Sequence, residues 1–180
     1  WSLRVYNSSG SLQKDWNGTT SNTSVALTYS TGADGTYDVN LTVRDNATNS
    51  NESTLRLYVD SLNPATTVHN VNNQSSGGYT TSRNLLINFT ATDAFLVNWS
   101  LVVYNVTGGL LTNWSNTAGN TSALMNYTVS ADGIYSANLT ARDNVSHTNT
   151  SNLIIIADAT NPAAAINSVN TNTTGQWSQN

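Results

Sequence analysis

Apolar and polar residues alternate along most of the chain, and no stretch keeps the spacing of an amphipathic helix. Between residues 62 and 158 the alternation falls into short segments separated by Gly, Asn, Asp and Ser, which is typical of strands joined by turns. The expected strands are residues 65–72, 84–93, 97–106, 110–116, 122–130, 134–143 and 151–158. The pattern therefore predicts an all-β protein, built as a β-sandwich.

The phase of the alternation predicts which side chains fill the interior. In the third strand Trp99 alternates with Leu101 and Val103, and a Trp at this place usually fills the centre of an immunoglobulin-like sandwich. Tyr135 follows Asp-Gly, the place of a tyrosine corner, whose hydroxyl bonds back to the preceding loop. Other expected inward residues are Leu85, Ile87, Phe89, Ala91, Ala137, Leu139 and Ala141. Seven strands with these two aromatic positions predict an immunoglobulin-like domain.

The chain matches itself, without a gap, when it is shifted by 98 residues. Of the 82 aligned pairs, 34 are identical, which is 41%. Matching positions include Trp1 with Trp99, Trp16 with Trp114, Tyr37 with Tyr135, Asn40–Asn46 with Asn138–Asn144 and Pro64 with Pro162. The period predicts tandem immunoglobulin-like domains of a common domain size.

Proline has no N–H for a central strand, so Asn63-Pro64 and its repeat partner mark domain boundaries. We expect residues 1–61 to be the C-terminal part of one immunoglobulin-like domain, residues 62–158 a complete domain and residues 159–180 the start of a third. The chain then looks cut from a longer array.

The first part lacks the first two strands of its sandwich, so something must cover its core. One source is sequence upstream of Trp1. The other is a strand from a neighbouring molecule, for which residues 163–172 are the candidate. Those residues supply a possible first strand and no second, so upstream sequence is favoured.

The last three strands of each copy resemble the immunoglobulin-like repeats of bacterial and archaeal surface proteins. The resemblance rests on D-G-x-Y at Asp34–Tyr37, followed by Asp45-Asn46, Val59-Asp60 and Asn63-Pro64. It implies the fold and an extracellular, tandem setting, such as an S-layer, adhesin or extracellular filament. It implies no particular activity, and this chain departs from the pattern in its density of Asn and its scarcity of charge.

Charged residues make up 9% of the chain, against roughly 25% in an average soluble domain. The net charge of −4 is wrong for a nucleic-acid binder, which needs a field of Lys and Arg. The absence of Cys excludes disulfides, thiol catalysis and zinc–thiolate sites. No apolar run is long enough for a membrane span.

Asn-x-Ser/Thr sequons, the acceptors of N-linked glycans, are twice as frequent as expected from composition. There are 17, where random placement of the 28 Asn and 49 Ser and Thr gives about eight. They are Asn7, Asn17, Asn22, Asn40, Asn46, Asn51, Asn73, Asn88, Asn98, Asn105, Asn113, Asn120, Asn126, Asn138, Asn144, Asn149 and Asn172. Within strands they fall on the phase opposite to the core. We therefore expect covalent N-glycans to replace charge at the surface; a plain Asn-rich surface is the alternative.

Catalytic residues are not expected, and we expect no enzyme. Glu52 is the only glutamate, so a pair of Glu carboxylates for glycoside hydrolysis is impossible. His69 and His147 are not repeat-equivalent and have no Ser/Asp arrangement near them in sequence, so both are interpreted as solvated.

Four aspartates recur at the domain ends, namely Asp45, Asp60, Asp143 and Asp158. The resemblance implies calcium at such positions in some repeats, and calcium needs six to eight oxygen ligands. The supply of oxygens here is thin, and the competing interpretation is that these side chains cap turns. No other cofactor is expected.

Trp16 and Trp114 are repeat-equivalent, as are Tyr79 and Trp177, and are interpreted as packing residues, with a sugar-binding platform as the alternative.

We expect a structural, heavily N-glycosylated extracellular protein that self-associates into a surface array, stalk or filament. An archaeal source fits the sequon density and the absence of Cys. The alternatives are an adhesin or carbohydrate-binding stalk of a larger cell-surface protein, and the accessory domain of an enzyme.

Overall fold

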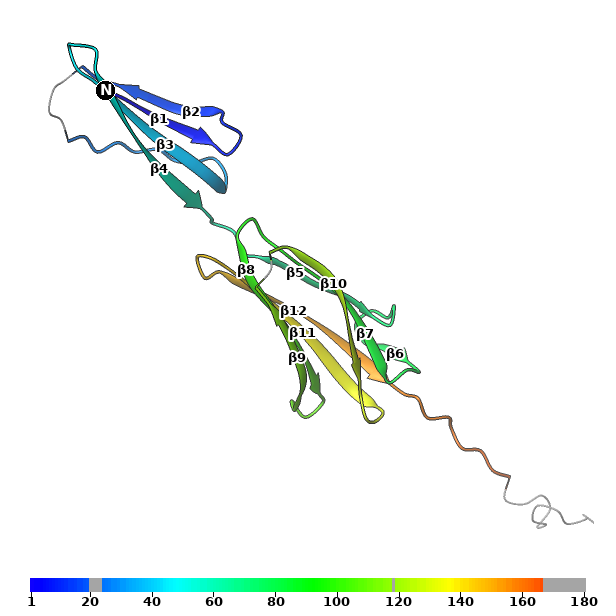
Figure 1. Cartoon of the computed structure of the whole chain (residues 1–180). Coiled ribbons are helices and arrows are strands. Elements are labelled where there is room, and N and C mark those ends of the chain that lie inside the picture. The colour runs from blue at the N-terminus through cyan, green and yellow to red at the C-terminus, as the bar shows by residue number, and fades with distance from the viewer. Residues whose placement is uncertain (20–23, 118, 167–180) are drawn as a thin grey trace, which may run out of the picture.

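The computed structural model describes residues 1–19, 24–117 and 119–166, and this part of the chain is all-β (Figure 1). Its strands form three sheets, and no helix occurs among the described residues. One sheet lies in residues 1–61, and the other two lie in residues 62–158.

Residues 62–158 form two sheets that pack face to face, as in a β-sandwich (Figure 1). The three-stranded sheet has the order β10-β7-β5, and the five-stranded sheet has the order β6-β12-β11-β8-β9. The strands are β5 (Ala65–Val71), β6 (Gly78–Thr80), β7 (Asn84–Thr92), β8 (Leu96–Asn105), β9 (Leu110–Asn116), β10 (Thr121–Thr128), β11 (Gly133–Asp143) and β12 (Thr148–Ala157). The seven expected strands are therefore confirmed to within a few residues at each end.

Strand β6 is the one that the alternation missed. It has three residues, too few to show a period of two, and it pairs in parallel with the end of β12. Its neighbours in sequence are turn residues, and Gly77 adopts a φ of +83°, which only Gly adopts readily.

The core lies between the two sheets, and its side chains are those that the phase predicts. Leu85, Ile87, Phe89 and Ala91 of β7 face Trp99, Leu101 and Val103 of β8 and the inward residues of β11, and all are buried. The rings of Phe89 and Trp99 pack with centroids 4.9 Å apart. Trp99 Nε1 donates a hydrogen bond to Thr121 Oγ1 at 3.0 Å, so its polar atom is satisfied at the core edge.

Both tyrosine corners form as the sequence predicts. Tyr135 Oη donates to the carbonyl of Ala131 at 2.7 Å, and Tyr37 Oη donates to the carbonyl of Ala33 at 2.7 Å. Each bond ties the start of a long strand, β11 or β3, to the loop before it.

Residues 1–61 form one four-stranded sheet with the order β2-β1-β3-β4. Its strands are β1 (Ser2–Asn7), β2 (Leu12–Asn17), β3 (Gly35–Arg44) and β4 (Ser50–Val59). The pairing register is that of the five-stranded sheet displaced by 98 residues: Leu3 pairs with Leu41 as Leu101 pairs with Leu139. No second sheet covers this one in the described part of residues 1–61.

The two parts lie end to end and are joined by the short linker of residues 60–64 (Figure 1). Pro64 is buried where the chain enters β5, and its carbonyl accepts a hydrogen bond from Asn149 Nδ2 at 2.9 Å. Beyond β12, residues 158–160 are still bonded to Thr80 and Asp132 of the sandwich, whereas residues 161–166 run away from it and are exposed. The rest of the candidate strand 163–172, from residue 167 on, lies outside the described residues.

Candidate functional site

The end of the first sheet meets the complete sandwich through side chains from both sides of the linker. The rings of Tyr58, at the end of β4, and Phe95, in the loop before β8, meet edge to face with centroids 6.0 Å apart. Ser61 Oγ in the linker donates to Asp34 Oδ1 at 2.8 Å. These contacts, with the Pro64 carbonyl bond, hold the linker against both neighbours.

Asp143 closes the turn between β11 and β12 and is the buried acid of this junction, with 1% of its surface exposed. Its Oδ1 accepts hydrogen bonds from the backbone N–H groups of Val145, at 2.9 Å, and His147, at 2.8 Å. The turn also contains Ser146 with a φ of +76°, so the carboxylate stabilises a strained backbone.

His147 joins the turn to the linker. Its Nδ1 lies 2.9 Å from Asp143 Oδ2 and 3.0 Å from the carbonyl oxygen of Leu62. Both neighbours are acceptors, so Nδ1 must carry the proton, and it is unable to act as a metal ligand in that state.

The interpretation of His147 as a solvated residue was wrong: the side chain is half-buried at the junction, whereas His69 is exposed. Sequence reasoning missed it because the repeat partner of His147 is Asn49.

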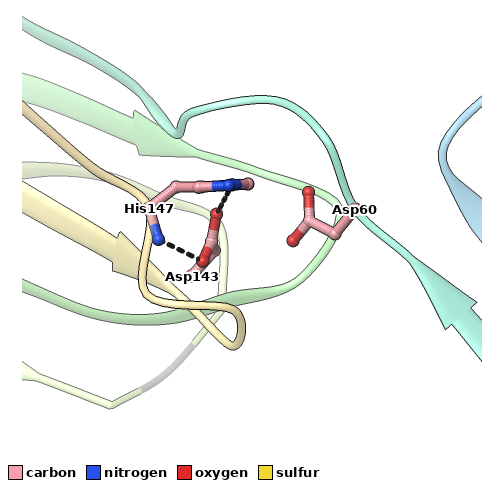
Figure 2. A group of neighbouring side chains, drawn as sticks. All are labelled: Asp60, Asp143 and His147. Carbon is pink, nitrogen blue, oxygen red and sulfur yellow. Dashed lines mark hydrogen bonds and ion pairs between the residues drawn. The ribbon is translucent and has the colours of Figure 1, made fainter.

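Asp60 completes the cluster from the linker side. One ligand atom each from Asp60, Asp143 and His147 lie within 4.8 Å of one another (Figure 2). Burial raises the pKa of Asp60, and the charges of Asp93, Asp143 and Asp34 raise it further, with a small opposing effect from His147. Four carboxylates from separate parts of the sequence therefore act on one another at the junction.

Oδ2 of Asp34 and Oδ2 of Asp60 are shielded from solvent and have no hydrogen-bond donor among the described residues. Oδ2 of Asp143 is also shielded, and it lies 2.9 Å from His147 Nδ1. Buried carboxylate oxygens without a donor are costly, and anionic oxygens are the ligands that a hard divalent cation prefers. Within the cluster of Figure 2, the oxygens of Asp60 and Asp143 lie within 4.8 Å of each other and are hard anionic donors, whereas Asp34 is not part of the cluster.

Of the four aspartates expected at domain ends, the structure brings only two together. Asp60 and Asp143 come together, whereas Asp45 and Asp158 lie at opposite ends of the described chain. Asp45 is the repeat partner of Asp143, and its oxygens accept bonds from Asn49 N at 2.9 Å and Asn49 Nδ2 at 2.8 Å. These bonds lower the pKa of Asp45. Asp158, the repeat partner of Asp60, is exposed.

Asp34 and Asp93 belong to the junction but were not selected from the sequence as site residues. Asp34 carried a signal, because it recurs as Asp132 in the second copy. Asp93 has no repeat partner within the chain, and its Oδ1 accepts the backbone N–H of Phe95 at 2.8 Å, which is ordinary turn chemistry. Only the folded chain shows that it faces Asp60.

The sequon asparagines lie at the surface wherever the structure describes them. Of the fifteen described, nine are exposed, six are partly exposed and none is buried; Asn22 and Asn172 lie outside the described residues. Asn7 and Asn105, a repeat-equivalent pair, each use the amide oxygen to accept turn N–H groups, at 2.9 Å from Ser11 and at 2.7 Å from Gly109. This leaves the amide nitrogen, the atom that carries a glycan, free of those bonds.

The two repeat-equivalent tryptophans are half-buried packing residues. Trp16 meets Tyr29 edge to face at 6.3 Å, and Trp114 meets Tyr127 at 6.4 Å. Trp114 also packs against the core of the complete sandwich. The rings are not displayed together on an open surface, so this geometry favours packing over a sugar-binding platform. Tyr79 is exposed, and Trp177 lies outside the described residues.

No family model matches the chain, and no curated protein matches it in sequence. Among the described residues no helix is long and apolar enough to cross a membrane.

Proposed function

We propose that this chain is a structural module of a glycosylated extracellular protein, built from tandem immunoglobulin-like domains with a period of 98 residues. Two features support the tandem arrangement: the repeated pairing register of the two larger sheets and the end-to-end placement across a short linker. Repeated sandwiches that each bury their own core add length without changing the interior of their neighbours. Such a module would form part of a surface array, stalk or filament.

The observation that carries this proposal is the position of the sequons. Within the strands of the complete sandwich, Asn88, Asn98, Asn126 and Asn138 alternate with inward apolar residues and point to the outer face. The surface carries few charges, and covalently attached sugars would supply the hydration that charged side chains supply elsewhere. They would also hinder the pairing of exposed strand edges.

The test is the intact mass of the protein purified from its natural source, before and after deglycosylation, followed by site mapping. We expect deglycosylation to lower the mass substantially, and we expect site mapping of peptides within residues 1–180 to find modification at sequon asparagines on both copies. Asn84 and Asn152, exposed strand asparagines outside any sequon, are the matched controls and should be unmodified. A mass equal to that of the polypeptide would contradict the proposal.

We also propose that the junction carboxylates bind a divalent cation of the calcium class, which would stiffen the connection between modules. The support is the approach of carboxylate oxygens of Asp60 and Asp143 to within 4.8 Å of each other, together with the shielded Oδ2 of Asp60, which has no donor among the described residues. Asp60 lies in the linker and Asp143 in the complete sandwich, so a bound cation would hold the two together. Its charge would also offset the repulsion that raises the pKa of Asp60.

The cation is tested by thermal unfolding in chelator and in millimolar Ca²⁺, with Mg²⁺ as the comparison. We expect Ca²⁺ to raise the unfolding midpoint by several degrees, since a ligand at 100 times its Kd adds about 2.7 kcal/mol. Asp60→Asn should abolish the Ca²⁺ effect and raise the midpoint in chelator, because it removes a repelled charge. Asp158→Asn, its repeat partner, should keep the wild-type response. Equal midpoints with and without Ca²⁺ in the wild type would contradict this proposal.

A further inference from the structure

The first sheet, β2-β1-β3-β4, exposes much of an apolar face that its repeat counterpart buries, although Val5 and Tyr37 on that face are themselves buried. The exposed fractions of three repeat-equivalent pairs are Leu55 60% against Leu153 2%, Leu57 43% against Ile155 1%, and Val43 48% against Ala141 0%. The residue types are similar and the pairing registers agree, so the strands themselves do not explain the difference. The complete sandwich differs in having the sheet of β5, β7 and β10 packed over this face.

Residues 24–31 likewise lack a structural partner that their repeat counterparts have. They are the repeat partners of residues 122–129, most of which form β10 by pairing with β7 from Thr121–Ala91 to Thr128–Asn84. Residues 24–31 form no strand, and the apolar Val25 and Leu27 are exposed. The sequence of a strand is present, but a partner edge like that of β7 is not.

We propose that a copy of the β5–β7 strand pair, joined directly before Trp1, covers this face and pairs with residues 24–31. The proposal rests on the repeat arrangement of the proposed function. It assigns the exposed face to one occupant, a segment of the same repeat type in the same polypeptide. The face is then an internal core and not a surface for a foreign ligand.

The register of the repeat favours this occupant. Trp1 corresponds to Trp99, so the residue joined before Trp1 corresponds to Asn98. In the complete sandwich only Asp93–Phe95 separate the end of β7 from the start of β8. A β7-like strand joined in the same register would therefore connect to β1 through an equally short loop and lie in the opposite sheet.

Residues 163–180 of a second copy are by themselves a poorer occupant. By the repeat, residues 163–169 correspond to β5, and the counterpart of β7 would begin beyond Asn180. In the complete sandwich β5 pairs with β7 and with no other strand, and β10 likewise pairs only with β7. A β5-like strand alone would give residues 24–31 no partner edge.

The experiment is a fusion in which residues 62–98 are placed before the full chain, so that Asn98 is joined directly to Trp1. Amide hydrogen exchange then reports on residues 24–31, and residues 122–129 of the same molecule report on correct folding. We expect protection of residues 24–31 to rise at least tenfold, toward that of residues 122–129, and binding of an apolar dye to fall.

The matched control is the same fusion with Leu85, Ile87 and Phe89 changed to Ser in the added copy only. It has the same length and should leave residues 24–31 unprotected. A second arm adds a synthetic peptide of residues 161–180 to the unfused chain, where no protection is expected. The proposal is overturned if the intact fusion leaves residues 24–31 unprotected while residues 122–129 are protected. It is equally overturned if the peptide alone protects residues 24–31. Neither outcome depends on glycosylation, so the proposed extracellular role is tested separately.

Discussion

At the scale of single residues, the two copies provide internal controls, because equivalent residues occupy different surroundings. Tyr37 and Tyr135 make the same hydroxyl bond to a loop carbonyl, although only Tyr135 belongs to a covered sandwich. The corner is therefore fixed by the local sequence Asp-Gly-x-Tyr and not by the second sheet. Asp60 and Asp158 show the opposite case, because Asp60 is partly buried and its pKa is raised by burial and by other carboxylates, whereas Asp158 is exposed.

We predict that Tyr135→Phe lowers the free energy of unfolding of the complete sandwich by about 1 kcal/mol, the usual net worth of a hydrogen bond. The ring would stay in place, and the carbonyl of Ala131 would lose its donor. Urea unfolding measures the change. Tyr104→Phe is the control, because that hydroxyl has no partner in the described part of the chain, and it should shift the midpoint little. Equal losses in the two variants would show that the corner bond contributes nothing.

A second residue-scale prediction concerns Asp132. The Arg83 guanidinium at 2.8 Å, the Thr160 hydroxyl and the Ala159 N–H hold the pKa of Asp132 far below its usual range. A lowered folded-state pKa gives stability that is present above the unfolded pKa of about 3.9 and is lost as the pH falls. Asp132→Asn should therefore destabilise the protein at pH 7 and matter less at pH 2. Because Asp132 is partly exposed, we expect a modest effect.

The measurement is urea unfolding of the wild type and of Asp132→Asn at pH 7 and pH 2. The difference between the two proteins should shrink at the lower pH. Asp60 acts in the opposite direction, because its raised pKa favours the protonated carboxyl in the folded state. The stability that Asp60 contributes therefore falls as the pH rises from its unfolded-state pKa through its raised folded-state pKa. A loss in Asp132→Asn that is the same at both pH values would contradict the role of its charge.

At the scale of elements, one sequence pattern gives a strand in one copy and none in the other. Residues 122–128 lie in β10 beside β7, and their repeat partners 24–30 have no such neighbour. Alternation predicts the capacity to form a strand, but a strand also needs an edge for its N–H and C=O groups.

We accordingly predict that the amides of residues 122–128 exchange with solvent much more slowly than those of residues 24–30 in the unfused chain. Half of the N–H groups in β10 donate to the neighbouring strand, and a coil has no such acceptors. Hydrogen exchange followed by mass spectrometry resolves the two peptides within one sample. Similar protection of both segments would contradict the structure at residues 24–30.

At the scale of the whole molecule, one four-stranded sheet and one complete sandwich lie end to end, and their polar exterior carries few charges and several exposed apolar side chains (Figure 1). Exposed large apolar side chains include Leu55, Tyr58, Leu124 and Ile154, and only 9% of residues are charged. Such a surface favours association unless something hydrates it.

If glycans supply that hydration, removing them from the natural protein should cause aggregation. We expect light scattering to rise after enzymatic or chemical deglycosylation at physiological salt, while mock-treated protein stays clear. The reason is that sugars no longer screen the apolar patches and strand edges. A deglycosylated protein that remains dispersed at the same concentration would show that the polypeptide surface suffices.

The sequence by itself determined seven of the eight strands of the complete sandwich, their inward faces and the tyrosine corners, because each depends on residues close together in the chain. A period of two and the Asp-Gly turn are local patterns, and the 98-residue period repeats them. The tertiary structure alone decided which aspartates meet. Asp34, Asp60, Asp93 and Asp143 are distant in sequence, and only the docking of the linker against the β11–β12 turn brings their charges together. It also decided that residues 24–31 form no strand, since backbone pairing requires a neighbour that local sequence is unable to supply.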